Sequence, residues 1–249
     1  TPNLVPVLTK YGYIDEAYRL FEQTEYASWL YPVTQGATSV WERWNSYTVE
    51  GGFNGNNSMN SFNHFSLGAI SEWMMSYQLG ITTEDGKAGY QNFVLQPTVG
   101  GTFTYANGSY ASNYGTIYSG WTADDGEITS YQATVPANTK ATLYLPMNET
   151  QVDCLRVPQG ASYVGREERN GQDCAKFTLV SGAYTFDIAT KLEASNLSSQ
   201  KLKAELEAAR KELAEAKKTA EEARKLAGEN SAKAQEALEA AKEAQLRVD

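Results

Sequence analysis

The sequence predicts a multidomain α+β protein in three parts. An aromatic segment with helical periodicity covers about residues 1–81, short alternating runs rich in Thr, Tyr and Val follow over 82–190, and an Ala/Glu/Lys/Leu tail covers 191–249. The hydrophobic period changes from helical to strand-like at the first boundary, and the composition changes at the second. We therefore expect helices, then an antiparallel β-sandwich, then a coiled-coil or helical-hairpin tail.

The first part contains three segments with helical signals. In YIDEAYRLFEQTEY, the spacing of three to four residues that indicates an amphipathic helix holds for Ile14, Ala17, Tyr18 and Phe21. A second helix can begin in TQGATSVWERW, after the break at Gln35 and Gly36.

The third helical segment is SFNHFSLGAISEWMMSYQL, for which Ser61 or Asn63 is the expected N-cap. One face of this predicted helix carries Phe62, Phe65, Ala69, Trp73 and Tyr77. Between the second and third segments lies TVEGGFNGNNSMN, a long Gly/Asn-rich loop. Long irregular loops in compact helical domains are more often functional than incidental.

The second part reads as about eight strands in an antiparallel sandwich. The predicted strands are NFVLQPTV, TFTYANGSY, GTIYSGWTAD, EITSYQATVP, KATLYLPM, QVDCLRV, SYVGREERNGQDCAKFTLV (which contains a hairpin) and GAYTFDI. Asp125-Gly126 and Asn170-Gly171 are tight hairpin signals. Nothing in this second part indicates a catalytic role, so we expect a packing or scaffolding domain.

The third part keeps one heptad register throughout. One position of the heptad is filled by Leu206, Leu213, Ala220, Ala227, Ala234, Ala241 and Val248, and its partner position by Leu202, Ala209, Ala216, Ala223, Asn230, Ala237 and Ala244. The residues 228–231 can end one helix and cap the next, which permits a hairpin. A solvated spacer and an oligomerising coil are the other interpretations.

Charge and composition exclude several classes of partner. Of 21 basic and 30 acidic side chains, the tail from Lys191 holds 12 of each, which leaves 9 basic and 18 acidic in the first 190 residues. Such an acidic body argues against nucleic acid and anionic membranes as partners. No apolar run is long enough to span a membrane, and no signal peptide is visible. Because TPNLVPVLTK resembles the middle of a domain, we expect the chain to begin inside a larger protein.

The only two cysteines, Cys154 and Cys174, lie twenty residues apart in the strand-rich part. A disulfide between them and two small apolar side chains in the sandwich core are equally good interpretations. Two cysteines without a histidine cluster are poor metal ligands.

The strongest candidate for chemistry is Glu42 in ATSVWERWNS, which lies between Trp41 and Trp44. The single histidine, His64, follows 22 residues later. Sugar C–H faces pack on indole rings, while carboxylate, imidazole and amide groups bind hydroxyls. The sequence has no zinc-ligand cluster, nucleophile elbow or phosphate-binding glycine motif, so we expect no metal and no cofactor.

Glycoside hydrolysis normally needs two carboxyl groups, one as acid and one as base or nucleophile. The other acidic residues of the helical part are Asp15, Glu16, Glu22, Glu25, Glu50 and Glu72. None has an aromatic setting like that of Glu42, so spacing alone leaves the second carboxyl group unassigned.

Three motifs together resemble the C-terminal part of bacterial α-L-rhamnosidases of glycoside hydrolase family 78. They are YASWLYPVTQGATSVWERWNSY, SMNSFNHFSLGAISEWM and GYQNFVLQPTVGGTFTYANGSYASNYGTI, within a likeness that covers roughly residues 1–190. The resemblance implies the last helices of an (α/α)6 barrel, then a β-sandwich, and an inverting hydrolysis of terminal α-L-rhamnose. It also implies that Glu42 is the general base and that His64 contacts rhamnose, and it suggests ligand roles for Trp41, Trp44 and Asn63.

The resemblance also implies what this chain does not hold. The family's general acid lies upstream, so we expect only about four of twelve barrel helices here and no activity from this chain alone. The family does not explain the heptad tail. The expected partners are a rhamnose-containing glycoside or polysaccharide, and either the missing barrel portion or a second copy bound through the tail. The localisation is open, with a secreted or surface location favoured over the cytoplasm.

Each candidate also has a structural interpretation. Glu42 could be a surface helix acid paired with Arg43 or Arg19, His64 a buried core histidine, and the two tryptophans barrel core. Two further functions remain open for the chain, namely a non-catalytic carbohydrate-binding or structural module and an interaction protein built on the tail.

Overall fold

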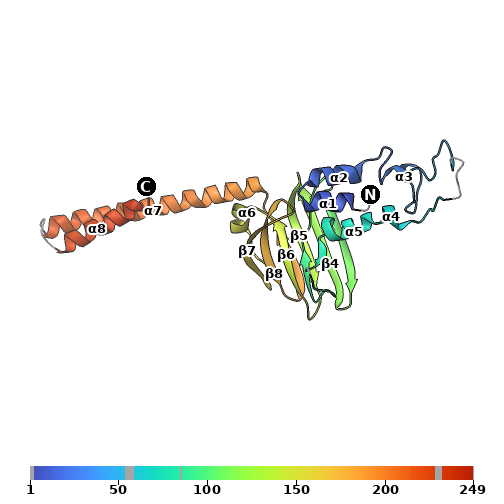
Figure 1. The fold of residues 1–249 in the computed structure, drawn as a ribbon. Coiled ribbons are helices and arrows are strands. Elements are labelled where there is room, and N and C mark those ends of the chain that lie inside the picture. Colours follow the sequence, from blue (N-terminus) through green and yellow to red (C-terminus); the bar gives the residue numbers. More distant parts are fainter. Residues whose placement is uncertain (1–2, 54–58, 85, 228–231, 249) are drawn as a thin grey trace. The chain divides into compact units, whose positions relative to one another are not determined.

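The computed structural model describes residues 3–53, 59–84, 86–227 and 232–248 (Figure 1). Contacts along the chain divide it into two compact units, Thr1–Lys191 and Leu192–Asp249. The first unit contains both the helical segments and the sandwich. None of the helices within the described ranges is both long enough and apolar enough to cross a bilayer.

The helical segments begin with α1 (Leu4–Lys10) and α2 (Ile14–Glu22), followed by the short α3 (Tyr31–Thr34). The predicted amphipathic helix is confirmed as α2, whose buried residues are Ile14, Ala17, Tyr18 and Phe21. The second predicted helix is wrong, because residues 36–46 form turns and extended backbone. Their hydrogen bonds go across to residues 61–64 instead of along a helix, as detailed for the candidate site below.

The third predicted helix exists but is divided into α4 (Phe65–Gly68), α5 (Ile70–Trp73) and the π-helical turn η1 (Met74–Gln78). Its N-cap is His64, not Ser61 or Asn63, because the His64 ring accepts a hydrogen bond from the Ser66 amide. The predicted apolar face is also wrong at its start. Phe65 is 81% exposed, and the buried residues of this segment include Leu67, Ile70 and Trp73. The break after Gly68 and the wider π turn shift the register away from a regular 3.6-residue period.

The strands form two sheets. The five-stranded sheet has the order β1 (Ile81–Thr83), β2 (Asn92–Leu95), β6 (Lys140–Pro146), β8 (Gln172–Leu179) and β7 (Ala161–Arg169). The four-stranded sheet has the order β3 (Tyr105–Ser112), β4 (Gly115–Asp124), β5 (Glu127–Val135) and β9 (Gly182–Asp187). All pairs are antiparallel except β2 with β6, which is parallel.

Two details of the strand prediction need correction. QVDCLRV is not a strand but contributes to helix α6 (Glu149–Cys154), because Asn148 and Gln151 form a reciprocal capping box at its start. Strand β1 was not anticipated. The two turn predictions are confirmed by positive φ angles at Asp125 and Gly126, of 46° and 76°, and at Asn170 and Gly171, of 51° and 72°.

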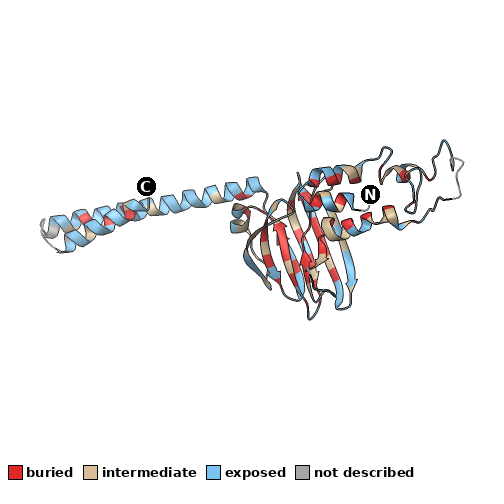
Figure 2. Cartoon of the chain, in the orientation of Figure 1, coloured by how far each residue is buried: buried red, intermediate tan, exposed pale blue. Residues whose placement is uncertain are grey.

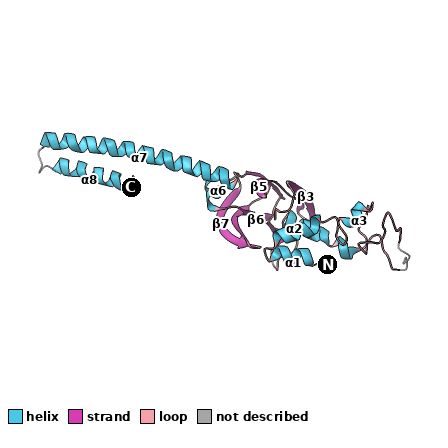
Figure 3. Ribbon diagram, turned by 90° about the horizontal axis from the view of Figure 1, so that it is seen from above, coloured by secondary structure: helices cyan, strands magenta, loops and turns pink. Residues whose placement is uncertain are grey.

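The core of the sandwich lies between the two sheets (Figure 2). It is built by inward-facing residues that include Phe93, Leu143, Phe177, Trp121, Tyr131 and Phe186. A second cluster joins the helices, where Val5, Tyr18 and Trp73 are buried and Phe103 packs against them. The Tyr18 hydroxyl donates to the Thr98 carbonyl at 2.6 Å, which ties α2 to the chain after β2. Figure 3 shows α1 and α2 beside the strands.

Cys154 and Cys174 form no disulfide bond, so the disulfide interpretation is wrong. Cys154 ends α6, whereas Cys174 lies on β8 and is buried. The core interpretation also needs correction. Cys174 does not face the inter-sheet core but packs with Val94 and Tyr144 on the other face of the five-stranded sheet.

The tail unit consists of α7 (Lys191–Ala227) and α8 (Ala232–Leu246). Side chains join the two helices, since Lys217 Nζ donates to Gln245 Oε1 at 3.1 Å and Arg247 lies 3.6 Å from Glu212. These pairs place the end of α8 beside the middle of α7, which agrees with the hairpin interpretation. The turn predicted at 228–231 lies outside the described residues, as do the side chains of Ala227 and Ala234.

Candidate active site

The candidate site is built by two loop segments that pair with each other. The Glu42 amide donates to the Ser61 carbonyl at 2.8 Å, and the His64 amide donates to the Val40 carbonyl at 2.9 Å. This short antiparallel pairing brings together two segments that are about twenty residues apart. It therefore places Glu42 and His64, the two residues that the sequence singled out, on neighbouring segments.

The Glu42 carboxylate is fixed by backbone rather than by a charged side chain. Its Oε2 accepts a hydrogen bond of 2.8 Å from the Ser61 amide. Across the described ranges, no basic side chain forms an ion pair with Glu42, which removes the interpretation as a surface acid paired with Arg43 or Arg19. The residue is half-buried, so the carboxylate is held but remains accessible.

The two tryptophans beside Glu42 have different surroundings. Trp41 is only 5% exposed, and its ring packs edge-on against Phe62 at 5.4 Å and Tyr47 at 6.4 Å. Trp44 is half-buried and packs edge-on against Trp29 at 5.3 Å. Trp41 is therefore part of a packed aromatic cluster, whereas Trp44 keeps more exposed surface.

His64 and Asn63 lie on the second segment. The His64 Nδ1 accepts from the Ser66 amide at 3.2 Å, so this nitrogen is the unprotonated one in the neutral ring and Nε2 carries the proton. The half-buried ring stacks on Phe65 at 5.3 Å and is not a core histidine. Asn63 is exposed, and its backbone bonds to the Ser61 hydroxyl.

The structure adds two residues that sequence reasoning missed. Ser61 supplies the amide that holds Glu42, and Phe65 exposes 81% of its surface beside the His64 ring. Every residue except proline has a backbone N–H group, so the residue type of Ser61 does not indicate that its amide binds Glu42. The Asn-His-Phe run placed Phe65 next to His64, but helical periodicity assigned it to a buried face.

Another acid of the helical part, Glu22, is engaged away from this site. The carboxylate of Glu22 accepts from both the amide and the hydroxyl of Thr102, at 2.7 and 2.8 Å, next to the sandwich. Within the described ranges, no group of three or more His, Cys, Asp or Glu side chains is arranged to hold a metal ion. The site thus presents one oriented carboxylate, one imidazole and aromatic surface.

An oriented carboxylate, an imidazole and aromatic rings, carried on two paired loop segments, are groups of the kind that bind carbohydrates. Residues 1–77 match the bacterial alpha-L-rhamnosidase 6 hairpin glycosidase domain, and residues 80–155 match the bacterial alpha-L-rhamnosidase C-terminal domain. The chain belongs to the bacterial α-L-rhamnosidase family, of which it carries a C-terminal part.

Individual relatives agree with this assignment. The chain is 38% identical over 188 residues to an alpha-L-rhamnosidase of Streptomyces avermitilis, which covers 76% of this chain and 17% of the relative. It is 38% identical over 151 residues to an alpha-L-rhamnosidase of Formosa agariphila, which covers 61% of this chain and 16% of the relative. The chain thus spans about a sixth of the length of these relatives.

Solved structures are similar as well. The Streptomyces avermitilis alpha-L-rhamnosidase complexed with L-rhamnose aligns with a TM-score of 0.66 at 37% identity, over 76% of this chain and 17% of that one. The native enzyme of Aspergillus terreus aligns with a TM-score of 0.58 at 28% identity, over 74% of this chain and 18% of that one. The tail from residue 192 lies beyond both matched domains.

Proposed function

We propose that this chain supplies the general base of an inverting α-L-rhamnosidase, with Glu42 as that base. The observation that carries the proposal is the hydrogen bond from the Ser61 amide to Glu42 Oε2. Among the described residues it is the carboxylate's one hydrogen bond, so Oε1 remains for a water molecule. A base that activates water must be oriented and still reachable, and Glu42 meets both conditions.

The ligand contacts in this proposal come from the second segment. His64 Nδ1 accepts from the Ser66 amide, so the Nε2–H group can donate a hydrogen bond to a sugar hydroxyl. The exposed Asn63 amide supplies a further donor and acceptor, and Phe65 and Trp44 supply apolar surface for the C–H face of rhamnose. Trp41 acts indirectly, as part of the packed aromatic cluster next to Glu42.

An inverting mechanism also requires a general acid. Acid and base stand about 6.5–9.5 Å apart in such enzymes, with a water between base and sugar. We assign the acid to the part of the family's barrel that the relatives contain and this sequence does not include. In this proposal residues 1–81 are barrel helices, 82–190 a supporting sandwich and 191–249 a helical tail, and this chain alone hydrolyses little.

The test compares aryl α-L-rhamnoside hydrolysis by this chain and by the same chain extended upstream in its native gene. Glu42→Gln in the extended protein should lower kcat by about a hundredfold to ten-thousandfold, because general base assistance is worth that much. Glu50→Gln is the matched control, since Glu50 is an exposed acid of the neighbouring loop, and it should leave kcat within about twofold.

Two outcomes would contradict the proposal. Activity of the short chain by itself would mean that its second carboxyl group is already present. An inactive extended protein that still binds sugars through the sandwich would favour the alternative of a non-catalytic carbohydrate-binding module.

A further inference from the structure

A cavity separate from Glu42 lies where the helices meet the five-stranded sheet. Its volume is about 570 Å³, within the range of about 300–1,000 Å³ that is typical of ligand sites. Its walls come from α5 and η1, β1, and the β7–β8 turn, all inside the first compact unit. The side chains that matter below are Glu72, Tyr77, Tyr90, Gln96 and Arg169.

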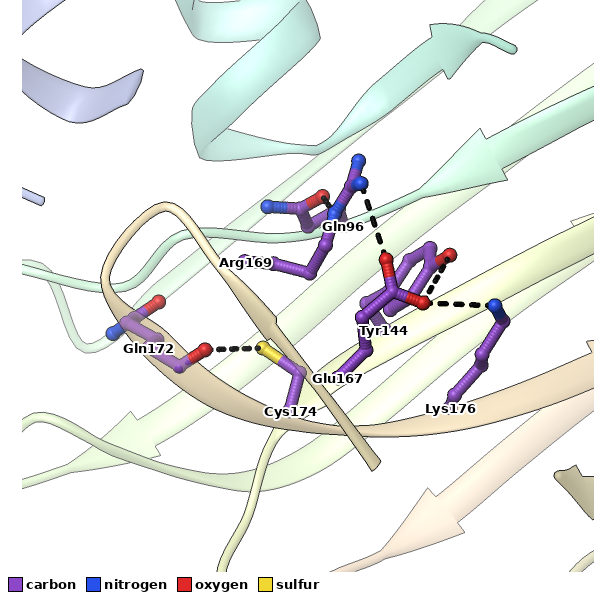
Figure 4. A network of polar contacts seen from close by, with 7 residues as sticks. All are labelled: Gln96, Tyr144, Glu167, Arg169, Gln172, Cys174 and Lys176. Atoms are coloured by element: carbon purple, nitrogen blue, oxygen red, sulfur yellow. Dashed lines mark hydrogen bonds and ion pairs between the residues drawn. The ribbon is translucent and has the colours of Figure 1, made fainter. Parts of the chain in front are cut away.

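Arg169 is held in place on one wall of this cavity (Figure 4). Its guanidinium carbon lies 4.7 Å from the centre of the Tyr144 ring, and its Nε donates to Gln96 Oε1 at 3.1 Å. Its Nη1 donates to Glu167 Oε1 at 3.4 Å. A guanidinium has five N–H donors, so this fixed group keeps donors for a ligand.

Glu167, the acid that binds Arg169, is itself held by a neighbouring side chain. Lys176 Nζ donates to Glu167 Oε2 at 2.8 Å, and this bond lowers the pKa of Glu167. Glu167 therefore stays ionised and keeps Arg169 oriented without entering the cavity.

Glu72 and two phenols form another part of the wall. Burial raises the pKa of Tyr77 and of Tyr90, and in both cases the negative charge of Glu72 adds to the rise. Glu72, Tyr77 and Tyr90 line the same cavity, and the Tyr90 hydroxyl also interacts with Tyr110. Tyr90 adopts a φ of 62° and packs 4.5 Å from the Tyr110 ring, which fixes its position.

The cavity is also rigid at its edge. The α1–α2 turn meets the β7–β8 turn so closely that a Cβ on Gly12 would lie 3.3 Å from Gly171 Cα. Helices and sandwich are thus in backbone contact beside Asn170, which lines the cavity. A preformed cavity loses less conformational entropy when a ligand binds.

We infer that this cavity is a second carbohydrate site, which binds a neutral sugar residue apart from the one at Glu42. Its charges are balanced, with Lys10 and Arg169 against Glu72 and Glu168, which disfavours a charged ligand. Two tyrosine rings offer surface for C–H faces, and carboxylate, guanidinium and amide groups offer partners for several hydroxyls. The choice of a sugar as ligand rests in part on the proposed function, because a second site would retain a long rhamnosylated glycan near Glu42.

The test is direct binding to the full chain, without hydrolysis. The probes are methyl α-L-rhamnoside, methyl β-D-glucoside and D-glucuronate, titrated to about 50 mM by calorimetry or saturation-transfer NMR, since single sugars bind weakly. We expect saturable binding of a neutral glycoside that Glu72→Gln and Arg169→Gln each weaken about tenfold or more. Glu25→Gln, at an exposed acid outside the cavity, should leave the Kd unchanged.

Three results would overturn the inference. The first is that neither neutral glycoside shows saturable binding. The second is that binding is lost in Glu42→Gln but kept in Glu72→Gln. The third is that only glucuronate binds. Thermal melting of each variant shows whether it is folded. A failure of the rhamnosidase proposal would be seen in hydrolysis by the extended protein and not in this titration, so the two failures are distinguishable.

Discussion

Cys174 illustrates how a single residue depends on its surroundings. It alternates on β8 with inward-facing residues such as Ala175 and Phe177, so it points away from the inter-sheet core. It is nevertheless only 1% exposed, because Val94 and Tyr144 cover it. Its thiol donates to the Gln172 carbonyl at 3.6 Å, a weak bond that leaves burial as the dominant influence.

This burial predicts an alkaline loss of stability that depends on Cys174. Burial raises the pKa of the Cys174 thiol from 9.0 to about 12. Above pH 9 the unfolded thiol ionises while the folded one does not, so the free energy of unfolding falls by up to about 1.4 kcal/mol per pH unit until pH 12. We expect the melting temperature of Cys174→Ala to fall less steeply than that of the original chain over pH 9–11.

The matched control for this prediction is Cys154→Ala, at the end of α6, which should keep the original slope. Equal slopes for the original chain and Cys174→Ala would contradict the prediction. Mass spectrometry without reductant should find no disulfide between Cys154 and Cys174.

At the scale of single residues, the residue types predicted only part of the candidate site. Glu42 stood out because two indoles flank it, and His64 because it is the only histidine. Their joint placement depends on backbone hydrogen bonds between residues 40–42 and 61–64, which no side-chain pattern announces. The local pattern also misjudged Phe65, because helix periodicity cannot tell a buried ring from one exposed at a helix start.

Among the elements, the passage from η1 into β1 depends on one glycine. Gly80 has a φ of 73°, and a Cβ there would lie 2.0 Å from the carbonyl carbon of Gln96. The Gln96 amide donates to the Gly80 carbonyl at 2.9 Å across this contact. The close approach lets the last helical turn pack directly onto the sandwich.

We therefore expect Gly80→Ala to cost about 3 kcal/mol or more in free energy of unfolding, because both backbones are fixed and must shift. Gly126→Ala is the matched control. Gly126 has a nearly equal φ of 76° but nothing within 4 Å of its added Cβ, so only the conformational cost of about 1–2 kcal/mol remains. Equal losses in urea titrations would show that the close contact with Gln96 is unimportant.

The contact of α7 with α8 is also decided at this scale. The buried residues of the tail include Leu213, Ala220, Ala241 and Ala244. Leu202 is 62% exposed, although it has the same heptad position as Ala244. The described length of α8 explains this difference. Its last residues lie beside Glu212 and Lys217, so the seam is covered only from about that point onward.

This difference predicts unequal effects of one substitution at two heptad positions. Leu213→Glu should lower the melting temperature of the helical signal, because it places an unpaired charge at a buried seam. Leu202→Glu should change it little. Circular dichroism at 222 nm measures both, and equal effects would argue against the hairpin. A loss of a concentration-dependent mass shift in Leu202→Glu would favour the oligomerising coil.

At the scale of the whole molecule, the helical part exposes more large apolar side chains than a solvated surface needs. They are Leu4, Val7, Tyr11, Tyr13, Tyr26, Val33, Val40, Val49, Phe53, Met59, Phe65 and Met74. Extended apolar surface of this kind marks an interaction site. In the proposed function most of this surface packs against further helices of the barrel, whereas Phe65 contacts the sugar.

We expect this chain alone to self-associate at micromolar concentration and to bind a hydrophobic dye such as ANS. The extended protein should lose both properties, because its added helices would cover the apolar side chains. Light scattering after size exclusion measures the mass. A monodisperse monomer of the short chain with one sharp two-state melting transition would contradict the prediction.

The sequence by itself determined most of the strands and part of the helical segments, because alternation and three-to-four spacing are local properties. It predicted α2, most of the strands, both hairpin turns and the helical tail, and it singled out Glu42 and His64. Tertiary structure decided what depends on distant partners. The antiparallel pairing of 40–42 with 61–64 replaced a predicted helix, and the outward burial of Cys174 replaced a predicted core position or disulfide. Hydrogen bonds between segments far apart in sequence, and cover supplied by other strands, are not encoded in any single stretch of residues.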